Sequence, residues 1–176
     1  MAQQPDVDPL TSAVRSVAWL IFANKPVYPL YVWWFAGTGV LASTLTAASA
    51  PLWLALAWFG PRHSLVLRAG APLLGLVDTA MATKLFGAAS GTELFFVPCL
   101  LLAVVSFRVD EARVSRALVA VLYLVVIAAH GRYGAPWHSW PADQLASLLD
   151  VNALAVASLC AFVGWKFAGL ERGRAL

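Results

Sequence analysis

Residues 27–60, VYPLYVWWFAGTGVLASTLTAASAPLWLALAWFG, run for 34 positions without a charged side chain. A membrane-crossing helix needs about 20 mostly apolar residues, so this stretch is long for one span and slightly short for two. Small and polar residues that favour a turn lie near its middle: Gly37, Thr38, Gly39, Ser43 and Thr44. We predict two spans, at about 27–42 and 44–60, with one long tilted helix as the alternative.

The composition of the whole chain also predicts a protein that lies in the hydrocarbon of a membrane. Of its 176 residues, 61% are hydrophobic and 12% are charged, and the mean hydropathy is +0.76. A soluble domain carries about 25% charged residues. Six or seven spans with short loops would use the full length, so we predict a single membrane domain over residues 1–176 with no soluble domain.

The segments around residues 27–60 complete an all-α bundle of six spans, with five spans as the alternative. Asp8-Pro9 predicts a helix start. Apolar residues at helical spacing then predict a short amphipathic helix over residues 9–23, lying on the membrane surface. The predicted spans cover residues 27–42, 44–60, 66–87, 93–107, 115–130 and 151–168.

The distribution of Lys and Arg predicts that both ends of the chain are cytoplasmic. Six spans leave only Lys84 and Arg132 on the outer side. Five spans would move Arg15 and Lys25 outside and weaken the asymmetry that membrane proteins show. The basic residues placed near the cytoplasm are Arg15, Lys25, Arg62, Arg68, Arg108, Arg113, Arg116, Lys166, Arg172 and Arg174.

Small residues predict which helix faces pack together. Helices associate in lipid by close approach of small side chains, because lipid is as apolar as leucine. The third span has Gly75 and Ala82 on one face, and the sixth has Ala157, Ala161 and Gly164. We predict that both faces point into the bundle.

Asp78 is the first candidate for chemistry. It lies near the middle of the third span, on the face of Gly75, where an ionised carboxylate costs about 2.5–3.5 kcal/mol on insertion scales. One interpretation is a site for a proton, an ion or a ligand. The other is a structural hydrogen bond between helices, to Thr79, Thr83 or Asn152.

Lys84 and Glu93 flank the predicted outer turn after the third span. Lys84 is six residues beyond Asp78 and therefore on a different face of the helix. We expect Lys84 to extend to the surface and to pair with Glu93.

The histidines offer a weak cofactor hypothesis. His130, at the end of the fifth span, could bind a haem or a pigment, although haem ligands in bundles usually project into the core. His63 and His138 fit membrane interfaces. No spacing in the sequence joins a nucleophile to a base or forms a metal-ligand motif, so we predict no enzyme activity and no metal.

Residues 87–111, GAASGTELFFVPCLLLAVVSFRVDE, resemble the MASE-type membrane sensor domains that precede bacterial cyclases and histidine kinases. The resemblance rests on a Gly-rich turn, a Glu with aromatics entering a helix, and a Phe followed by charges: Gly87, Gly91, Glu93, Phe95, Phe96, Phe107, Arg108 and Glu111. It implies a six-helix bundle in the bacterial inner membrane, here without an output domain.

The sequence predicts a non-catalytic membrane module, either sensor-like or an accessory subunit of a larger complex. Its expected partners are the lipid bilayer and other membrane subunits or a second copy. The net charge of +3 follows from topology, so no nucleic acid is expected. The alternatives are a small transporter or proton conduit that uses Asp78, and a haem or pigment binder that uses His130.

Overall fold

The computed structural model describes residues 8–60 and 64–172, and every regular element in this part of the chain is helical. This confirms the all-α fold class. The elements are α1 (Pro9–Asn24), α2 (Tyr28–Ala36), α3 (Val40–Leu45), η1 (Thr46–Ser49), α4 (Ala50–Phe59), α5 (Ser64–Phe86), η3 (Ala88–Ser90), η4 (Thr92–Phe95), α6 (Phe96–Val105), η5 (Val109–Glu111), α7 (Ala112–Ala129) and α8 (Ala142–Arg172).

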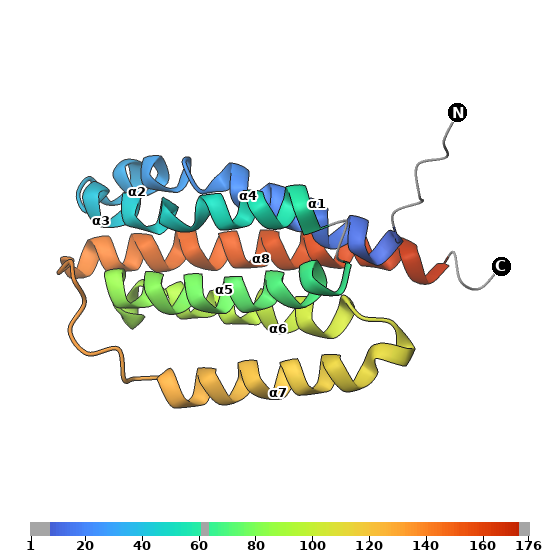
Figure 1. Cartoon of the computed structure of the whole chain (residues 1–176). Helices are drawn as coiled ribbons and strands as arrows, with labels where there is room; N and C mark the ends of the chain where they lie inside the picture. The colour runs from blue at the N-terminus through green and yellow to red at the C-terminus, as the bar shows by residue number, and fades with distance from the viewer. Residues whose placement is uncertain (1–7, 61–63, 173–176) are drawn as a thin grey trace.

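The passes of the chain run along one bundle axis in alternating directions, with α1 and α2 in the first pass and α3 and α4 in the second (Figure 1). α8 contacts α1, α2 and α6, whereas α7 lies at the edge and contacts α5 and α6. The start of α1 and the end of α8 lie at the same end of the bundle (Figure 1), which we call the terminal end. The other end, where α2 turns into α3 and α5 meets η3, is the distal end.

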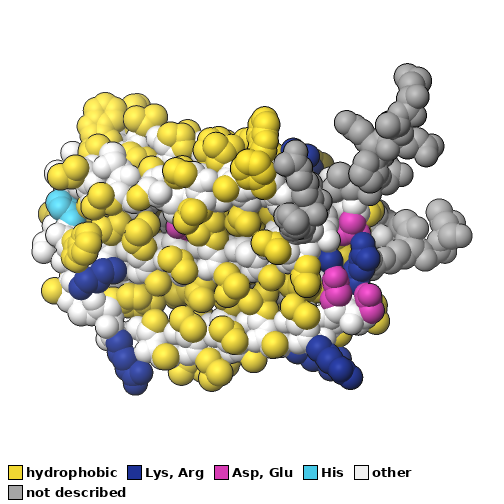
Figure 2. All heavy atoms as spheres, viewed as in Figure 1, with side chains coloured by type: hydrophobic (Ala, Val, Ile, Leu, Met, Phe, Trp, Pro, Cys, Tyr) yellow, Lys and Arg dark blue, Asp and Glu magenta, His cyan; other side chains and the backbone are white. Residues whose placement is uncertain are grey.

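Four helical segments are long and apolar enough to cross a membrane: Val40–Phe59, Ser64–Phe86, Val109–Ala129 and Ala142–Leu170. Thr92–Val105 is apolar but shorter. At 1.5 Å per residue, the 23 residues of α5 extend about 35 Å, compared with about 30 Å of hydrocarbon. Figure 2 shows hydrophobic side chains across the middle of the bundle and Lys and Arg toward its two ends.

The chain reverses direction at Gly37–Gly39, inside the long uncharged stretch. Gly37 and Gly39 both have positive φ angles, of 69° and 71°, which side chains other than glycine rarely adopt. A Cβ on Gly39 would also collide with the ring of Trp140. The stretch is therefore not one long helix, and the turn comes earlier than the boundary predicted near residue 43.

Helix α1 departs from the predicted surface helix. The helix starts where predicted, because Asp8 accepts a hydrogen bond from the Thr11 backbone N–H at 3.1 Å. However, Val14 and Val17 are almost fully buried, and α1 packs against α4, α5 and α8. Arg15, which suggested a polar face, donates to the Ala57 carbonyl of α4 at 2.9 Å.

The small-residue faces of α5 and α8 differ in burial: one points into the bundle and the other outward. On α5, Gly75 is buried and Ala82 is half-buried, as predicted. On α8, Ala157, Ala161 and Gly164 are exposed, and a Cβ on Gly164 would meet no atom within 4 Å. The prediction that the α8 face points into the bundle was therefore wrong, because Ala157, Ala161 and Gly164 face outward while Leu148, Val163 and Phe167 of the same helix are buried.

Candidate functional site

An ion pair lies inside the bundle, about midway along α5. Lys25 Nζ is 2.7 Å from Asp78 Oδ2, and each side chain is only 12% exposed. Asp78 comes from α5, and Lys25 lies in the break between α1 and α2. A mid-helix carboxylate thus meets a charged residue placed at a chain interruption.

Two further groups complete this cluster. Trp53 Nε1 of α4 donates to Asp78 Oδ2 at 2.6 Å, and Lys25 Nζ donates to the Thr46 carbonyl of η1 at 2.9 Å. Asp78 Oδ1 is buried and has no hydrogen-bond partner among the described residues. We call Lys25, Asp78, Trp53 and the Thr46 carbonyl the charged centre.

Prolines and a tight turn explain why two neighbouring passes are interrupted here. Pro26 follows Lys25 directly, and Pro29 lies in the first turn of α2. Proline lacks the backbone N–H that the interior of a helix needs, so the hydrogen-bond ladder is interrupted at Pro26. α2 starts again with Pro29 in its first turn, where that N–H is not needed. The next pass changes from α3 to the 3₁₀ turn η1, and Pro51 then begins α4. The Thr46 carbonyl of that turn is the one that Lys25 reaches.

Gly75 brings α6 close to the charged centre. It lies one helical turn before Asp78, and a Cβ at this position would be 2.7 Å from Cys99 Sγ of α6. The same Cβ would be 4.0 Å from the Trp53 ring. Glycine at this position therefore allows α4, α5 and α6 to meet beside the carboxylate.

The free-energy cost of burying charges indicates that this centre has a function. Charged side chains are rare inside membrane segments, and they mark ion pathways, proton relays and ligand sites. Once a buried pair has formed, removal of one partner destabilises a protein by about 3–5 kcal/mol, because the other charge stays buried alone. Lys25 and Asp78 therefore depend on one another.

The hydrogen-bond partners predicted for Asp78 were wrong. Thr83 Oγ1 instead donates to the Thr79 carbonyl of the same helix at 2.8 Å. Thr92 Oγ1 of η4 donates to Thr83 Oγ1 at 3.1 Å. These hydroxyls join α5 to the turn that follows it.

Asn152 belongs to the same buried polar region, nearer the distal end. Its Nδ2 donates to the Ser90 carbonyl at 2.8 Å, and its Oδ1 accepts from the Tyr28 hydroxyl at 3.2 Å. The side chain is fully buried. Asn152 therefore links α2, η3 and α8 by hydrogen bonds, and it does not contact Asp78 as predicted.

Lys84 and Glu93 do not pair with each other. Lys84 Nζ donates to the carbonyls of Tyr133 and Ala135, at 2.9 and 2.8 Å. Glu93 Oε2 lies 3.1 Å from His130 Nδ1. The predicted pair is thus replaced by two separate contacts, both with the segment that follows α7.

His130 is placed poorly for an axial haem ligand. Its side chain is 75% exposed, at the distal end of the bundle, and it does not project into the core. His138 packs against the ring of Trp140. Among the described residues, no group of three or more His, Cys, Asp and Glu side chains could hold a metal ion.

A second set of charges ties the terminal end together. Arg68, which is 1% exposed, makes two 2.6 Å hydrogen bonds to the Glu111 carboxylate. Arg108 Nη2 lies 2.7 Å from Asp8 Oδ1. Burial tends to raise the pKa of Asp8, but hydrogen bonds from Arg108 and Thr11 outweigh it and hold that pKa below its ordinary value.

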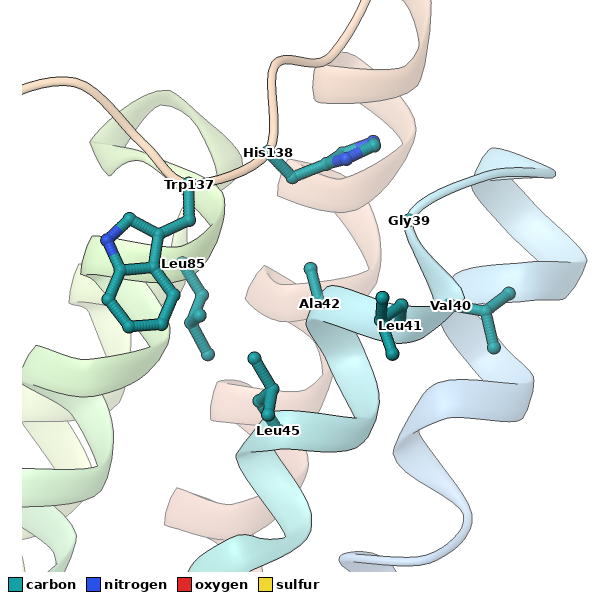
Figure 3. Close-up of a pocket in the computed structure, with 8 residues that line it drawn as sticks. All are labelled: Gly39, Val40, Leu41, Ala42, Leu45, Leu85, Trp137 and His138. Carbon is teal, nitrogen blue, oxygen red and sulfur yellow. The ribbon is translucent and has the colours of Figure 1, made fainter.

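A cavity of about 320 Å³ lies at the distal end, apart from the charged centre. Figure 3 shows Trp137 and Leu85 on one side of it and Ala42 and Leu45 on the other. The lining is mostly apolar, with His138 at its rim. This cavity does not include Asp78 or its partners.

Lys25 and Trp53 are site residues that the sequence pattern alone did not predict. Lys25 was assigned to the cytoplasmic side, whereas the structure places it midway along the bundle with Asp78. The available signal was a single charge between apolar segments, followed by Pro26 and Pro29. Of the other basic residues in that count, Arg62 and Arg174 lie outside the described residues.

The comparisons with known proteins do not assign the chain. No protein-family model matches it, and no curated protein matches it significantly.

Proposed function

We propose that the protein is a small membrane transporter or proton conduit that works through the charged centre. The observation that carries this proposal is the buried Lys25–Asp78 pair, placed where two neighbouring passes of the bundle are interrupted. In membrane transporters, such broken helices bring backbone carbonyls and helix ends to ion and substrate sites near the membrane midplane. The unpartnered Asp78 Oδ1 supplies a free acceptor for a proton or a cation at this point.

The same proposal includes six spans, with both ends of the chain in the cytoplasm of a bacterium. α1 and α2 would form the first span together, and α3, η1 and α4 the second. Exposed tryptophans at both ends of the bundle support helices that cross the membrane, because aromatic side chains gather at both membrane interfaces. Trp33 and Trp34 lie toward the distal end, and Trp58 and Trp165 toward the terminal end.

Ion flux into liposomes tests the transport function. The purified protein is reconstituted, and proton uptake driven by a membrane potential is followed with a trapped pH dye. We expect flux from the native protein and a loss of at least about tenfold in Asp78→Asn. Glu93→Gln is the matched control, because Glu93 is a carboxylate outside the charged centre. Equal flux in the native protein and Asp78→Asn would contradict the proposal.

A sensor-like module or accessory subunit is the second candidate function. It is favoured by the outward small-residue face of α8, where Ala157, Ala161 and Gly164 leave room for another helix. The MASE-type resemblance of residues 87–111 belongs to this candidate. Cross-linking from a cysteine at position 161 in native membranes tests it. A specific adduct supports a docked helix, and no adduct under conditions that label the cysteine counts against one.

A further inference from the structure

We propose that the Lys25 ammonium is a tethered cation in a site for monovalent cations, and that a free cation replaces it when Lys25 releases its proton. The site consists of the Asp78 carboxylate and the Thr46 carbonyl. This inference rests on the proposed function, since it names the ion that the same charged centre would exchange.

The ammonium position already has oxygen ligands of the kind that a small cation binds. Lys25 Nζ lies 2.7 Å from Asp78 Oδ2 and 2.9 Å from the Thr46 carbonyl oxygen. A hard cation such as Na⁺ is bound by carboxylate and carbonyl oxygens, and unwound backbone supplies such carbonyls in membrane transporters. Asp78 Oδ1, which is buried and unpartnered, would be the third oxygen.

Trp53 keeps the carboxylate in position without neutralising it. Its indole N–H donates to Asp78 Oδ2, and the side chain is 1% exposed. An indole can donate one hydrogen bond but cannot supply a charge. Lys25 therefore supplies the positive charge that balances Asp78.

The exchange conserves charge inside the bundle. Lys25–NH₃⁺ loses a proton to water and becomes a neutral amine, and one M⁺ takes its place beside the ionised Asp78. The site holds one negative and one positive charge before and after the exchange. It therefore avoids an isolated charge in an apolar surrounding, which is the costly state.

The neighbouring groups do not offer a second amine for this exchange. Around the centre, the titratable or charged side chains on packed elements are Arg15 of α1, Tyr28 of α2, Cys99 of α6 and Cys160 of α8. Arg15 donates to the Ala57 carbonyl, and Tyr28 donates to Asn152. Cys99 lies close enough to interact electrostatically with Asp78. Among the described residues at the centre, Lys25 is the only amine.

Thermal unfolding of the full chain in detergent tests cation binding. Tm is measured in NaCl and in choline chloride at equal ionic strength. We expect Na⁺, and not choline, to raise Tm of the native protein under alkaline conditions, where a free cation can replace the ammonium. At a tenfold excess over Kd the rise should be about 3–6 °C. Lys25→Met should show this rise already at neutral pH, and Lys25→Met/Asp78→Asn should not show it at any pH.

Proton release provides a second readout that needs no variant. Addition of NaCl to the native protein in weakly buffered detergent at alkaline pH should release up to one proton per chain, seen with a pH dye. Choline chloride should release none. If Lys25→Met does not fold, the native protein and Asp78→Asn still decide the question.

The absence of any Na⁺-specific rise in Tm and of any Na⁺-specific proton release in the native protein would overturn the inference. An equal Na⁺ effect in Asp78→Asn would overturn it too, because the site would lie elsewhere. Na⁺ binding without liposome flux would contradict the transport function and leave the site standing. Proton flux without Na⁺ binding would contradict the cation site and leave the transport function standing.

Discussion

The first third of the chain and its last two helices differ in how they suit an apolar surrounding. From α1 to α4, each pass of the bundle is interrupted, and the interruptions meet a buried ion pair. α7 and α8 are continuous helices of 18 and 31 residues, and few of their apolar side chains are fully buried. The first region supplies Lys25 of a buried ion pair, whereas Asn152 is the only buried polar side chain among the described residues of α7 and α8.

This difference follows from backbone hydrogen bonding. A continuous helix satisfies its own N–H and C=O groups, so an apolar sequence is sufficient in lipid. A broken helix leaves carbonyls that another group must meet. Here the Lys25 ammonium meets the Thr46 carbonyl, and Asp78 balances the ammonium. The interrupted helix therefore supplies a carbonyl for the buried ammonium, and the ammonium satisfies that carbonyl.

Breaking the ion pair should have the largest effect. Lys25→Met or Asp78→Ala leaves one buried charge without its partner, so we expect a loss of about 3–5 kcal/mol in the free energy of unfolding. Denaturant titration in detergent measures it. Leu154→Ala, at a 71% exposed position of α8, should change stability by about 0.5 kcal/mol or less.

The double variant Lys25→Met/Asp78→Asn sharpens this prediction. Because neither residue then carries a charge, it should be more stable than Lys25→Met alone. Additive losses from the two single changes would show that the residues do not interact, and the comparison of the two regions would fail.

Removal of Glu111 should have the next largest effect. Glu111→Gln replaces the carboxylate that receives two hydrogen bonds from Arg68, which is almost fully buried. Hydrogen bonds to charged groups contribute about 1.5–3 kcal/mol each, and we expect a loss of about 2–3 kcal/mol. Thermal unfolding tests this, with exposed Asp110→Asn as the control. A similar loss in both variants would contradict the specific role of Glu111.

The same Gly→Ala substitution should lower stability on α5 and raise it on α8. Gly75→Ala places a Cβ 2.7 Å from Cys99 Sγ, so we expect a loss of about 1–2 kcal/mol from overpacking. Gly164→Ala meets no atom within 4 Å and should gain up to about 1 kcal/mol of helix stability. Chemical denaturation of both variants in the same detergent measures the difference. Equal effects would remove the distinction between an inward and an outward face.

Acid should produce the smallest effect, through Asp8. Its pKa lies below its ordinary value of 3.8 in the folded protein, so its contacts stabilise the fold above that pH. That contribution is lost as pH falls through the lower folded-state pKa. We expect about 1 kcal/mol from the helix cap. Asp8→Asn should weaken the acid dependence of Tm, and an unchanged acid dependence would contradict this assignment.

The sequence predicted α5 and α7 better than the interrupted passes or α8, which begins at Ala142, nine residues before the predicted span 151–168. Predicted spans at 66–87 and 115–130 fall within a few residues of α5 and α7. The amphipathic pattern of residues 9–23 was interpreted as a surface helix, because a polar stripe does not show whether it faces water or another helix. Arg15 in fact bonds a carbonyl of α4. Boundaries in the interrupted passes depend on those tertiary contacts.

The candidate site was half predictable. Asp78 could be identified from one carboxylate in a long apolar segment. Its partners Lys25 and Trp53 lie 53 and 25 residues earlier in the chain, and only the packing of separate passes brings them together. The same limitation applies to Lys84 and Glu93, which are close in sequence but bind different groups.

The ionisation state of Asp78 tests the central claim most directly. Infrared difference spectra between the native protein and Asp78→Asn, both in lipid at neutral pH, report it. A charged pair with Lys25 predicts that the variant loses the two stretching bands of an ionised carboxylate. Loss of the carbonyl band of a protonated carboxylic acid instead would show that Asp78 is neutral, and the charged centre would not exist as described.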